Sequence, residues 1–376
     1  MGRFFTFSLM AVLLLALAAC TTKPVEPAPA EFVMEHLSNY ETPDTCFNKG
    51  VSAAYCGVSN GYLVLAGGCN FPHVPAAQGG EKIYYDYIWA SSLSDGTKPN
   101  WKLVGRIPQA SAYGITLPYQ NKLICVGGLA TGGEKLNAVY ALEVKEDQLS
   151  LDTLPSLPVC VDNAYGAIEG SMVYVVGGNA DGQASGAVYK LDLGAENLAW
   201  VLETELPGAP RVQPVCAISH HALYIFGGYT PKIFENIPAF MPSNGMKYDL
   251  QTQTWDEVEA PLTPAGEIIA LAGGAAVASP DGEQIICIGG VNQDIFPRAL
   301  NGELSGPSYM ENPVEWYKFN RYILAFQVET EQWQILSECE EGARAGASLV
   351  NDGTWNYIIN GELKPGIRTP MISRFK

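Results

Sequence analysis

The sequence predicts an all-β fold, a β-propeller of six four-stranded blades, on two observations. First, a Gly-Gly doublet ends a hydrophobic strand five times along the chain, and an altered sixth copy, Asn360-Gly361, follows Tyr357-Ile358-Ile359. Second, the 376 residues include 39 glycines and 25 prolines, a composition that favours many short strands joined by turns over helices. Six such units around one axis fall within the usual range of propellers.

Each doublet belongs to a longer unit that recurs about every fifty residues. A strand of small residues precedes the doublet, as in Ala112-Tyr113-Gly114, and an aromatic strand and a tryptophan follow it, as in Tyr189 with Trp200. The uninterrupted apolar run before each doublet indicates a strand buried on both faces, as expected for an inner blade strand. Four strands per unit with this pattern resemble the kelch repeat. The complete doublets are Gly67-Gly68, Gly127-Gly128, Gly177-Gly178, Gly227-Gly228 and Gly289-Gly290.

The two ends of the predicted propeller, residues 31–376, are expected to pair with each other. After the sixth doublet only Met371 to Lys376 remain, which is enough for one more strand. The missing outer strand of that blade is expected from Phe32 to Leu37. Ring closure of this kind removes the exposed sheet edges that an open stack would leave.

Residues 1–20 are predicted to be a lipoprotein signal peptide. Leu9 to Ala19 is apolar but too short to span a bilayer as a stable helix, and Leu17-Ala18-Ala19-Cys20 resembles a bacterial lipobox, in which the cysteine thiol receives a diacylglycerol. The alternative is an ordinary signal peptide cut near Ala19. Residues 21–30, with three prolines, are expected to be a flexible tether. We therefore expect a protein on the periplasmic side of a bacterial membrane, held there only by the lipid on Cys20.

The net charge and the histidine and cysteine content limit the kinds of partner, metal site and disulfide that we expect. The formal net charge is −17 with only 22 lysines and arginines, which argues against nucleic acid because phosphate binding needs clustered basic residues. The four histidines lie outside any Cys/His metal pattern, so we expect no metal and no cofactor. Cys125 lies in an apolar strand and is expected to be a small buried hydrophobe. An oxidising compartment permits one disulfide among Cys46, Cys56 and Cys69.

The candidate site lies in the altered sixth repeat. Glu362 directly follows the strand end, and Arg368 comes after the turn signal Lys364-Pro365-Gly366, so both groups can reach one rim. The alternative is an ion pair on a solvated loop. Two long segments, Cys69 to Ile83 and Val291 to Asn320, also follow doublets. We expect these two segments and the loop of the sixth repeat to gather on one face around a central funnel.

The segment Asn360-Gly361-Glu362-Leu363-Lys364-Pro365-Gly366-Ile367-Arg368-Thr369 resembles the most diagnostic motif of the kelch-type sialic acid mutarotases, the N-acetylneuraminate epimerases. Residues 289–296, 210–213 and 112–118 are similar to further motifs of that family. The Asn-Gly-Glu blade comes last here and mid-chain in the best-known members, so the chain resembles a cyclically permuted branch. A closed ring tolerates such a change because the new termini fall at a surface junction.

The resemblance implies an isomerase that interconverts the anomers of sialic acid or a related sugar acid. It implies that Glu362 is the catalytic acid/base and Arg368 its partner. We assign Arg368 to the carboxylate of the sugar, because a guanidinium fork can hold a carboxylate with two hydrogen bonds.

Four further residues are expected to bind the substrate. Asn292 and Gln293 can donate hydrogen bonds to sugar hydroxyls or the acetamido group, and their alternative role is loop capping. Arg211 and Gln213 begin a strand and are expected to face the funnel, with a structural hydrogen bond as the alternative.

The main alternative function is a non-catalytic propeller that binds a glycan or a protein through the same face, since fold does not fix function. A copper oxidase of the propeller type would need a paired-histidine metal site, and the four scattered histidines argue against it. The sequence leaves the oligomeric state and the preferred sugar open.

Overall fold

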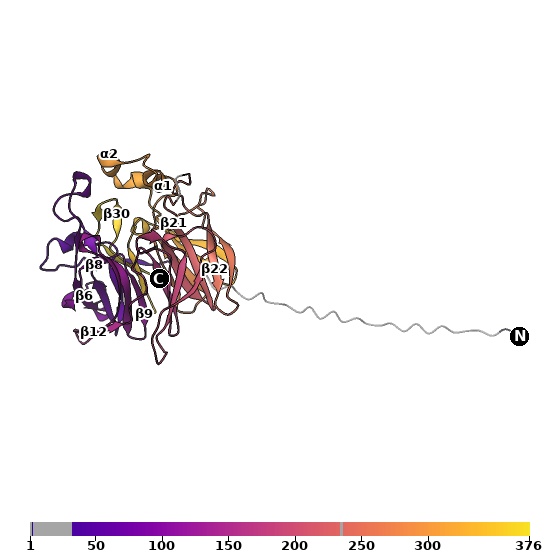
Figure 1. The fold of residues 1–376 in the computed structure, drawn as a ribbon, viewed down its shortest axis with the longest axis horizontal. Helices are drawn as coiled ribbons and strands as arrows, with labels where there is room; N and C mark the ends of the chain where they lie inside the picture. Colours follow the sequence, from indigo (N-terminus) through magenta and orange to yellow (C-terminus); the bar gives the residue numbers. More distant parts are fainter. Residues whose placement is uncertain (1, 3–31, 234–235) are drawn as a thin grey trace. The chain divides into compact units, whose positions relative to one another are not determined.

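The computed structural model describes Gly2 and residues 32–376, apart from 234 and 235. Apart from Gly2, the predicted signal peptide at 1–20 lies outside the described residues, as do the lipidation site Cys20 and the tether at 21–30. Antiparallel sheets are the main regular structure of the described chain, and its helices are short (Figure 1). None of these helices is long and apolar enough to cross a membrane.

Six main sheets follow one another along the described chain, each with four antiparallel strands that pair in sequence order except in the last sheet. The second sheet has β8 (Ser111–Ala112) as a fifth strand. From the inner strand outward, their strands are β2 (Tyr55–Ser59), β3 (Tyr62–Ala66), β6 (Tyr87–Ser92) and β7 (Lys102–Arg106); β9 (Ile115–Tyr119), β10 (Lys122–Ala130), β11 (Lys135–Lys145) and β12 (Gln148–Leu154); β14 (Tyr165–Glu169), β15 (Met172–Val176), β18 (Ala187–Asp192) and β19 (Val201–Glu205); β20 (Val212–Ser219), β21 (Ala222–Tyr229), β22 (Asn244–Asp249) and β23 (Thr254–Glu259); β24 (Ala275–Ala278), β25 (Gln284–Ile288), β26 (Tyr322–Gln327) and β27 (Gln332–Glu338); and β28 (Ser348–Asn351), β29 (Asn356–Ile359), β32 (Ile372–Phe375) and β1 (Met34–Leu37).

Short elements decorate these sheets. Within the part of the chain that the structure describes, the α-helices are α1 (Ile295–Leu300) and α2 (Gly306–Met310), and the 3-10 turns are η1 (Phe47–Lys49), η2 (Ala76–Gln78), η3 (Leu93–Asp95), η4 (Thr131–Gly133), η5 (Val314–Tyr317) and η6 (Glu340–Gly342). The small strands are β4 (Cys69–Asn70) with β5 (Ile83–Tyr84), β13 (Val161–Asp162) with β16 (Asn179–Ala180) and β17 (Gln183–Ala184), β30 (Glu362–Lys364) with β31 (Ile367–Arg368), and β8 (Ser111–Ala112), which pairs with β10.

The six inner strands surround one centre. Each contacts the inner strand of the next sheet, and β28 of the last sheet contacts β2 of the first. One residue ahead of or at the start of each inner strand has a positive φ, between 51° and 72°, and its N–H donates to the carbonyl of the preceding member at 2.7–3.1 Å. These six ring residues form a closed cycle of hydrogen bonds; they are Ala53, Tyr113, Asn163, Gln213, Gly273 and Gly346.

The glycine doublets mark close backbone contacts between neighbouring sheets. The N–H of Gly68 donates to the carbonyl of Ser111 in the next sheet at 2.9 Å, and Gly361 donates to Val51 at 3.0 Å. A Cβ atom on Gly67 would lie 2.4 Å from the carbonyl oxygen of Ser111, so a side chain does not fit there. In the sixth copy Asn360 takes the first position with a φ of 57°, a conformation that asparagine tolerates better than most residues.

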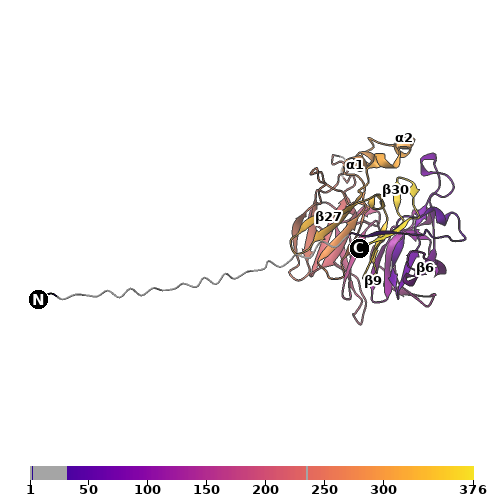
Figure 2. The same cartoon turned by 180° about the vertical axis from the view of Figure 1, so that it is seen from behind.

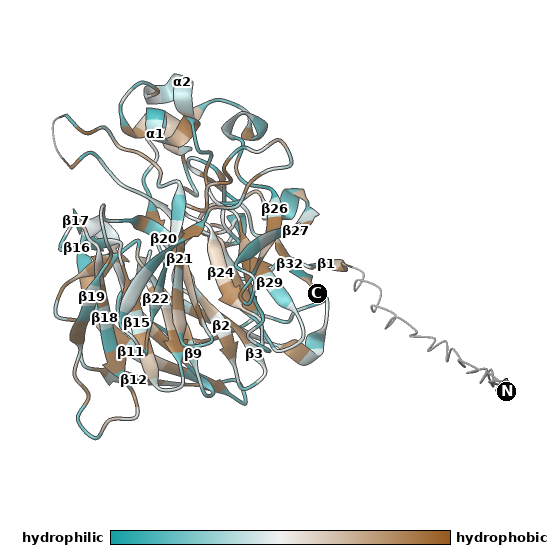
Figure 3. Ribbon diagram, turned by 90° about the vertical axis from the view of Figure 1, so that its right-hand side faces the viewer, coloured by the Kyte–Doolittle hydropathy of each residue, from teal (hydrophilic) through white to brown (hydrophobic). Residues whose placement is uncertain are grey.

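The N-terminal strand completes the last sheet. β1 pairs antiparallel with β32, so that Met34 lies opposite Phe375 and Leu37 opposite Ile372. The rings of Phe32 and Phe375 stack with centroids 5.6 Å apart. Figure 3 shows β1, β32 and β29 side by side. The first and last described strands therefore belong to one sheet.

The hydrophobic core is divided among the spaces between adjacent sheets. Phe226 of β21 and Phe326 of β26 come from neighbouring sheets, and their ring centroids are 5.0 Å apart. Trp333 of β27 packs against both rings. Aromatic side chains thus fill the space between these two sheets.

Three loops gather on one side of the sheets. Figures 1 and 2 show α1, α2 and the β30–β31 hairpin together at this end of the molecule. Lys364 of the hairpin donates through Nζ to the carbonyl of Met310 in α2 at 3.1 Å and to that of Asn312. Gly366 lies against Ala76 of η2, so that a Cβ on this glycine would be 2.6 Å from that of Ala76. The loops that follow the first, fifth and sixth doublets therefore meet.

Candidate active site

A cavity of about 400 Å³ lies at the centre of the ring, on the side covered by the loops. All six ring residues line it, so backbone hydrogen bonds fix its floor. Its walls come from the three long loops and include Phe71, Asn292, Glu362 and Arg368. A site of this size holds a small organic molecule.

Glu362 and Arg368 face each other across the β30–β31 hairpin. They are register partners, and Nη1 of Arg368 lies 2.9 Å from Oε1 of Glu362. The same carboxylate oxygen accepts a hydrogen bond from the N–H of Gly366 in the turn, at 2.6 Å. The Glu362 side chain is 24% exposed and that of Arg368 only 3%, so the carboxylate keeps access to the cavity while the guanidinium is packed.

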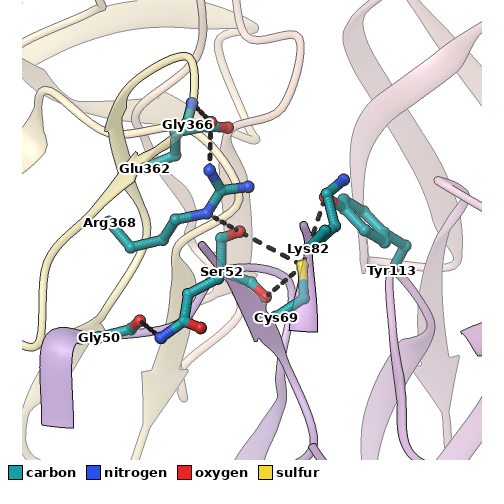
Figure 4. Close-up of polar contacts among 9 residues, drawn as sticks. Gly50, Ser52, Cys69, Lys82, Tyr113, Glu362, Gly366 and Arg368 are labelled. Carbon is teal, nitrogen blue, oxygen red and sulfur yellow. Dashed lines mark hydrogen bonds and ion pairs between the residues drawn. The ribbon is translucent and has the colours of Figure 1, made fainter. Parts of the chain in front are cut away.

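Three neighbours hold the Arg368 guanidinium. Nε donates to Oγ of Ser52 at 3.1 Å, and Nη1 lies beside the Glu362 carboxylate (Figure 4). Cζ lies 5.0 Å from the centre of the Phe71 ring. Burial acts to lower the pKa of Arg368, but the Glu362 carboxylate, with Cys69 and Tyr113, raises the pKa above its ordinary value. Arg368 therefore stays positively charged inside the cavity wall.

A second polar cluster, which the sequence did not single out as a site, lies beside this pair. Nζ of Lys82 donates to the Tyr113 hydroxyl at 2.9 Å, and Sγ of Cys69 lies 3.4 Å from the same oxygen. Tyr113 is a ring residue, and Lys82 and Cys69 come from the long loop after the first doublet. The sequence pointed to that loop by its length and to the segment around Tyr113 by its similarity to a family motif. However, no rule of sequence spacing predicts a contact between residues of two different sheets.

Asn292 and Gln213 line the cavity, as expected for residues that contact a substrate. Oδ1 of Asn292 accepts hydrogen bonds from the N–H groups of Asp294 and Ile295, at 3.0 and 2.9 Å, and so also caps the start of α1. Nε2 of Gln213 donates to Oδ1 of Asn163 at 2.9 Å. Both residues thus combine a structural contact with a position in the cavity wall.

Arg211 and Gln293 do not line this cavity, so the structure does not bring these two residues to the wall that Glu362 and Arg368 share. Nη1 of Arg211 donates to the carbonyls of Gly227 and Asn244, at 3.3 and 2.9 Å, and the side chain is buried. Gln293 borders a separate small pocket, where its Oε1 is buried without a hydrogen-bond partner. Arg344 takes the equivalent place in the last sheet and donates to the carbonyl of Asn360 at 2.9 Å. Arg211 therefore supports a glycine doublet.

The structure has free thiols at the three cysteines among which an oxidising compartment permits one disulfide, Cys46, Cys56 and Cys69. Cys69 is buried beside the cavity, with Sγ 3.9 Å from Oγ of Ser52. Burial raises the pKa of the Cys56 thiol to about 12, and the same effect acts on Cys125 in its strand.

Comparisons with known proteins single out one family. A family model described as N-acetylneuraminate epimerase matches residues 18–151 and 154–376. Similar curated proteins include the N-acetylneuraminate epimerases of Shigella flexneri serotype 5b (strain 8401) and Escherichia coli (strain K12), each 34% identical over 232 residues, or 58% of this chain and 59% of the relative. The chain thus spans less than two thirds of these relatives. A solved structure titled "Structure of YjhT" is 31% identical over 57% of this chain and 61% of its own, with a TM-score of 0.49.

Proposed function

Because this chain belongs to the N-acetylneuraminate epimerase family, we propose that it is an isomerase that interconverts the anomers of N-acetylneuraminate or a related sugar acid. The observation that carries the proposal is the Glu362 carboxylate, held next to Arg368 at the wall of a central cavity. Catalysed anomer exchange of a single-anomer sugar, followed by proton NMR, tests it.

The architecture we propose is a closed six-bladed kelch-type propeller. The cycle of hydrogen bonds through the six ring residues and the pairing of β1 with β32 support closure. We further propose that the chain is a cyclic permutation of its relatives. A permuted chain aligns collinearly over only part of its length, and the curated relatives match over 58% of this chain.

The reaction needs two proton transfers. Opening the pyranose ring removes a proton from the anomeric hydroxyl and adds one to the ring oxygen, and reclosure on the other face reverses both. We assign the anomeric proton to Glu362, since a positioned carboxylate is an effective general base and, once protonated, the matching acid. The N–H of Gly366 fixes one oxygen of this carboxylate and so orients the group.

Arg368 is assigned to the carboxylate of the sugar. In sialic acid the anomeric carbon carries both the carboxylate and the anomeric hydroxyl, so a carboxylate bound at Arg368 brings that hydroxyl to Glu362. Lys82 also carries a positive charge, and its Nζ lies 5.7 Å from the Phe71 ring that Arg368 contacts. Two cations around one aromatic ring favour an anionic ligand.

Asn292 and Gln213 are assigned to the sugar's hydroxyl and acetamido groups, because both line the cavity with amide side chains. An amide can donate and accept, so each can recognise either group. Arg211 and Gln293 are left out of the substrate contacts. The proposed reaction changes no oxidation state, so it calls for no redox cofactor.

The alternative is a propeller that binds a glycan through the same cavity without catalysis. Both readings predict sugar binding, and only the isomerase predicts anomer exchange above the spontaneous rate. We also propose that the chain is anchored through a lipid on Cys20 at the periplasmic side of a bacterial membrane, on the lipobox-like sequence Leu17-Ala18-Ala19-Cys20.

A further inference from the structure

The Tyr113 hydroxyl holds an unusual position at the cavity. Figure 4 shows Tyr113 and Lys82 on one side, Glu362 and Arg368 on the other, and Cys69 between them. The backbone of Tyr113 has a φ of 64°, which is uncommon for a bulky residue and persists only where the surroundings enforce it.

The hydrogen-bond ring enforces this conformation. The N–H of Tyr113 donates to the carbonyl of Ala53 at 2.9 Å, and the carbonyl of Tyr113 accepts from the N–H of Asn163 at 3.0 Å. Both backbone polar groups of the residue are therefore committed to the ring. The side chain is directed by the framework of the whole fold and not by a mobile loop.

The Lys82 contact determines which way the phenol proton can go. An ammonium group can only donate, so the Tyr113 oxygen is the acceptor in its 2.9 Å hydrogen bond with Nζ of Lys82. The thiol of Cys69, 3.4 Å from the same oxygen, is at most a weak partner. The Tyr113 O–H is consequently left to donate to a group inside the cavity that this residue lines.

We propose that Tyr113 is the second proton-transfer group of the site and that Lys82 positions it and stabilises its anion. This inference rests on the proposed anomer exchange. On ring opening, Glu362 takes the anomeric hydroxyl proton, the bond between the anomeric carbon and the ring oxygen breaks, and Tyr113 protonates that oxygen. On reclosure the new hydroxyl returns its proton to the Tyr113 phenolate while Glu362 protonates the former carbonyl oxygen, so both side chains end as they began.

The charges around Tyr113 favour this sequence of proton transfers. Burial and Cys69 raise the pKa of Tyr113 well above its usual value, and Arg368 opposes this while the Glu362 charge adds to it. The phenol therefore holds its proton in the resting site. When Glu362 accepts a proton from the sugar, its negative charge disappears, which lowers the pKa of Tyr113 and makes the phenol a better donor at the moment a donor is needed.

The test is Tyr113→Phe, which removes one oxygen atom. We expect the exchange rate at saturating sugar to fall roughly 10²-fold, the size typical of one general acid, with the half-saturating sugar concentration little changed. Tyr55→Phe is the matched control: its buried hydroxyl donates to the carbonyl of Gly127 at 2.6 Å and does not line the cavity, so the exchange rate should stay at the wild-type value. Thermal unfolding of both variants reports whether either fold is damaged.

Lys82 is tested by Lys82→Met and Lys82→Arg. A positioning role predicts a lower saturated rate for methionine, by about tenfold, and partial recovery with arginine, which restores the charge. If Tyr113→Phe exchanges anomers at the wild-type rate, the inference is overturned while the proposed function stands. If Lys82→Met changes only the half-saturating concentration of acidic sugars, Lys82 binds the substrate carboxylate and its assigned role is wrong. If the wild type accelerates nothing, the proposed function itself fails.

Discussion

Nη1 of Arg368 lies 2.9 Å from Oε1 of Glu362 across the β30–β31 hairpin, and both side chains line the central cavity. From the sequence, we assigned Arg368 to the carboxylate of the substrate. In the structure, its guanidinium also forms an ion pair with the Glu362 carboxylate. The two roles are compatible: a sugar carboxylate that binds Arg368 competes with Glu362 for the guanidinium. We expect that competition to release the Glu362 oxygen for the anomeric hydroxyl.

Arg368→Lys keeps the charge but loses the planar fork, including the Nε contact with Ser52. We predict weaker binding of carboxylated sugars, by about tenfold or more, since a hydrogen bond to a charged group contributes roughly 1.5–3 kcal/mol. Activity on neutral aldoses should suffer less. Titration with an acidic and a neutral sugar measures the difference, and equal loss on both would mean that Arg368 holds the hairpin and not the substrate.

Arg211→Met tests the structural role of that arginine. The change leaves the carbonyls of Gly227 and Asn244 without their buried donor, which costs about 1–3 kcal/mol of stability. Urea unfolding should show this loss, while sugar affinity of the folded variant stays at the wild-type value. Gln213→Ala is the comparison, because Gln213 lines the cavity and its loss should weaken sugar binding. Reduced affinity in folded Arg211→Met would return this residue to the binding site.

Removing β1 tests ring closure. A protein that begins at residue 38 lacks the strand paired with β32 and exposes that edge. We predict a lower midpoint of thermal unfolding for the whole domain and a tendency to aggregate. The control is a protein that begins at residue 31, which keeps β1. Equal unfolding midpoints for the two proteins would show that β1 contributes nothing to closure.

Cys20→Ala tests the proposed anchor. The variant has no thiol for a diacylglycerol, so it should leave the detergent phase in a phase-partition assay of cell extracts. Folding should be unaffected, because residues 21–30 are proposed to act only as a tether. Continued partitioning with detergent would point to another means of membrane attachment.

Sequence patterns predicted what depends on local periodicity. The doublets located the sheet junctions because a residue without a side chain lets two backbones meet closely, as Gly67 does beside Ser111. The Asn-Gly-Glu motif brought Glu362 and Arg368 together because one tight turn joins them. The truncated last repeat pointed to an outer strand from the N-terminal segment, and β1 lies in that place.

The positions of other residues at the site depend on three-dimensional geometry that no sequence pattern predicts. Arg211 and Gln213 begin a strand and were both expected to face the funnel. The alternation of side chains along a regular strand puts residues that are two apart on one face. The positive φ of Gln213, 53°, breaks that alternation, and Arg211 turns into the sheet junction. Lys82 and Tyr113 come from different sheets, so only the assembled ring brings Nζ and the hydroxyl within 2.9 Å.

The most direct test of the central claim is one-dimensional proton NMR of fresh single-anomer N-acetylneuraminate with wild-type protein and with Glu362→Gln. The glutamine keeps the shape of the side chain but cannot exchange a proton with the sugar. We predict that the wild type brings the anomers to equilibrium well above the spontaneous rate. Glu362→Gln should still bind the sugar but lose about 10²–10⁴-fold of the catalysed rate. Glu303→Gln, in an exposed ion pair with Arg298, is the control and should match the wild type. Exchange by Glu362→Gln at the wild-type rate, or no acceleration by the wild type, would contradict the account.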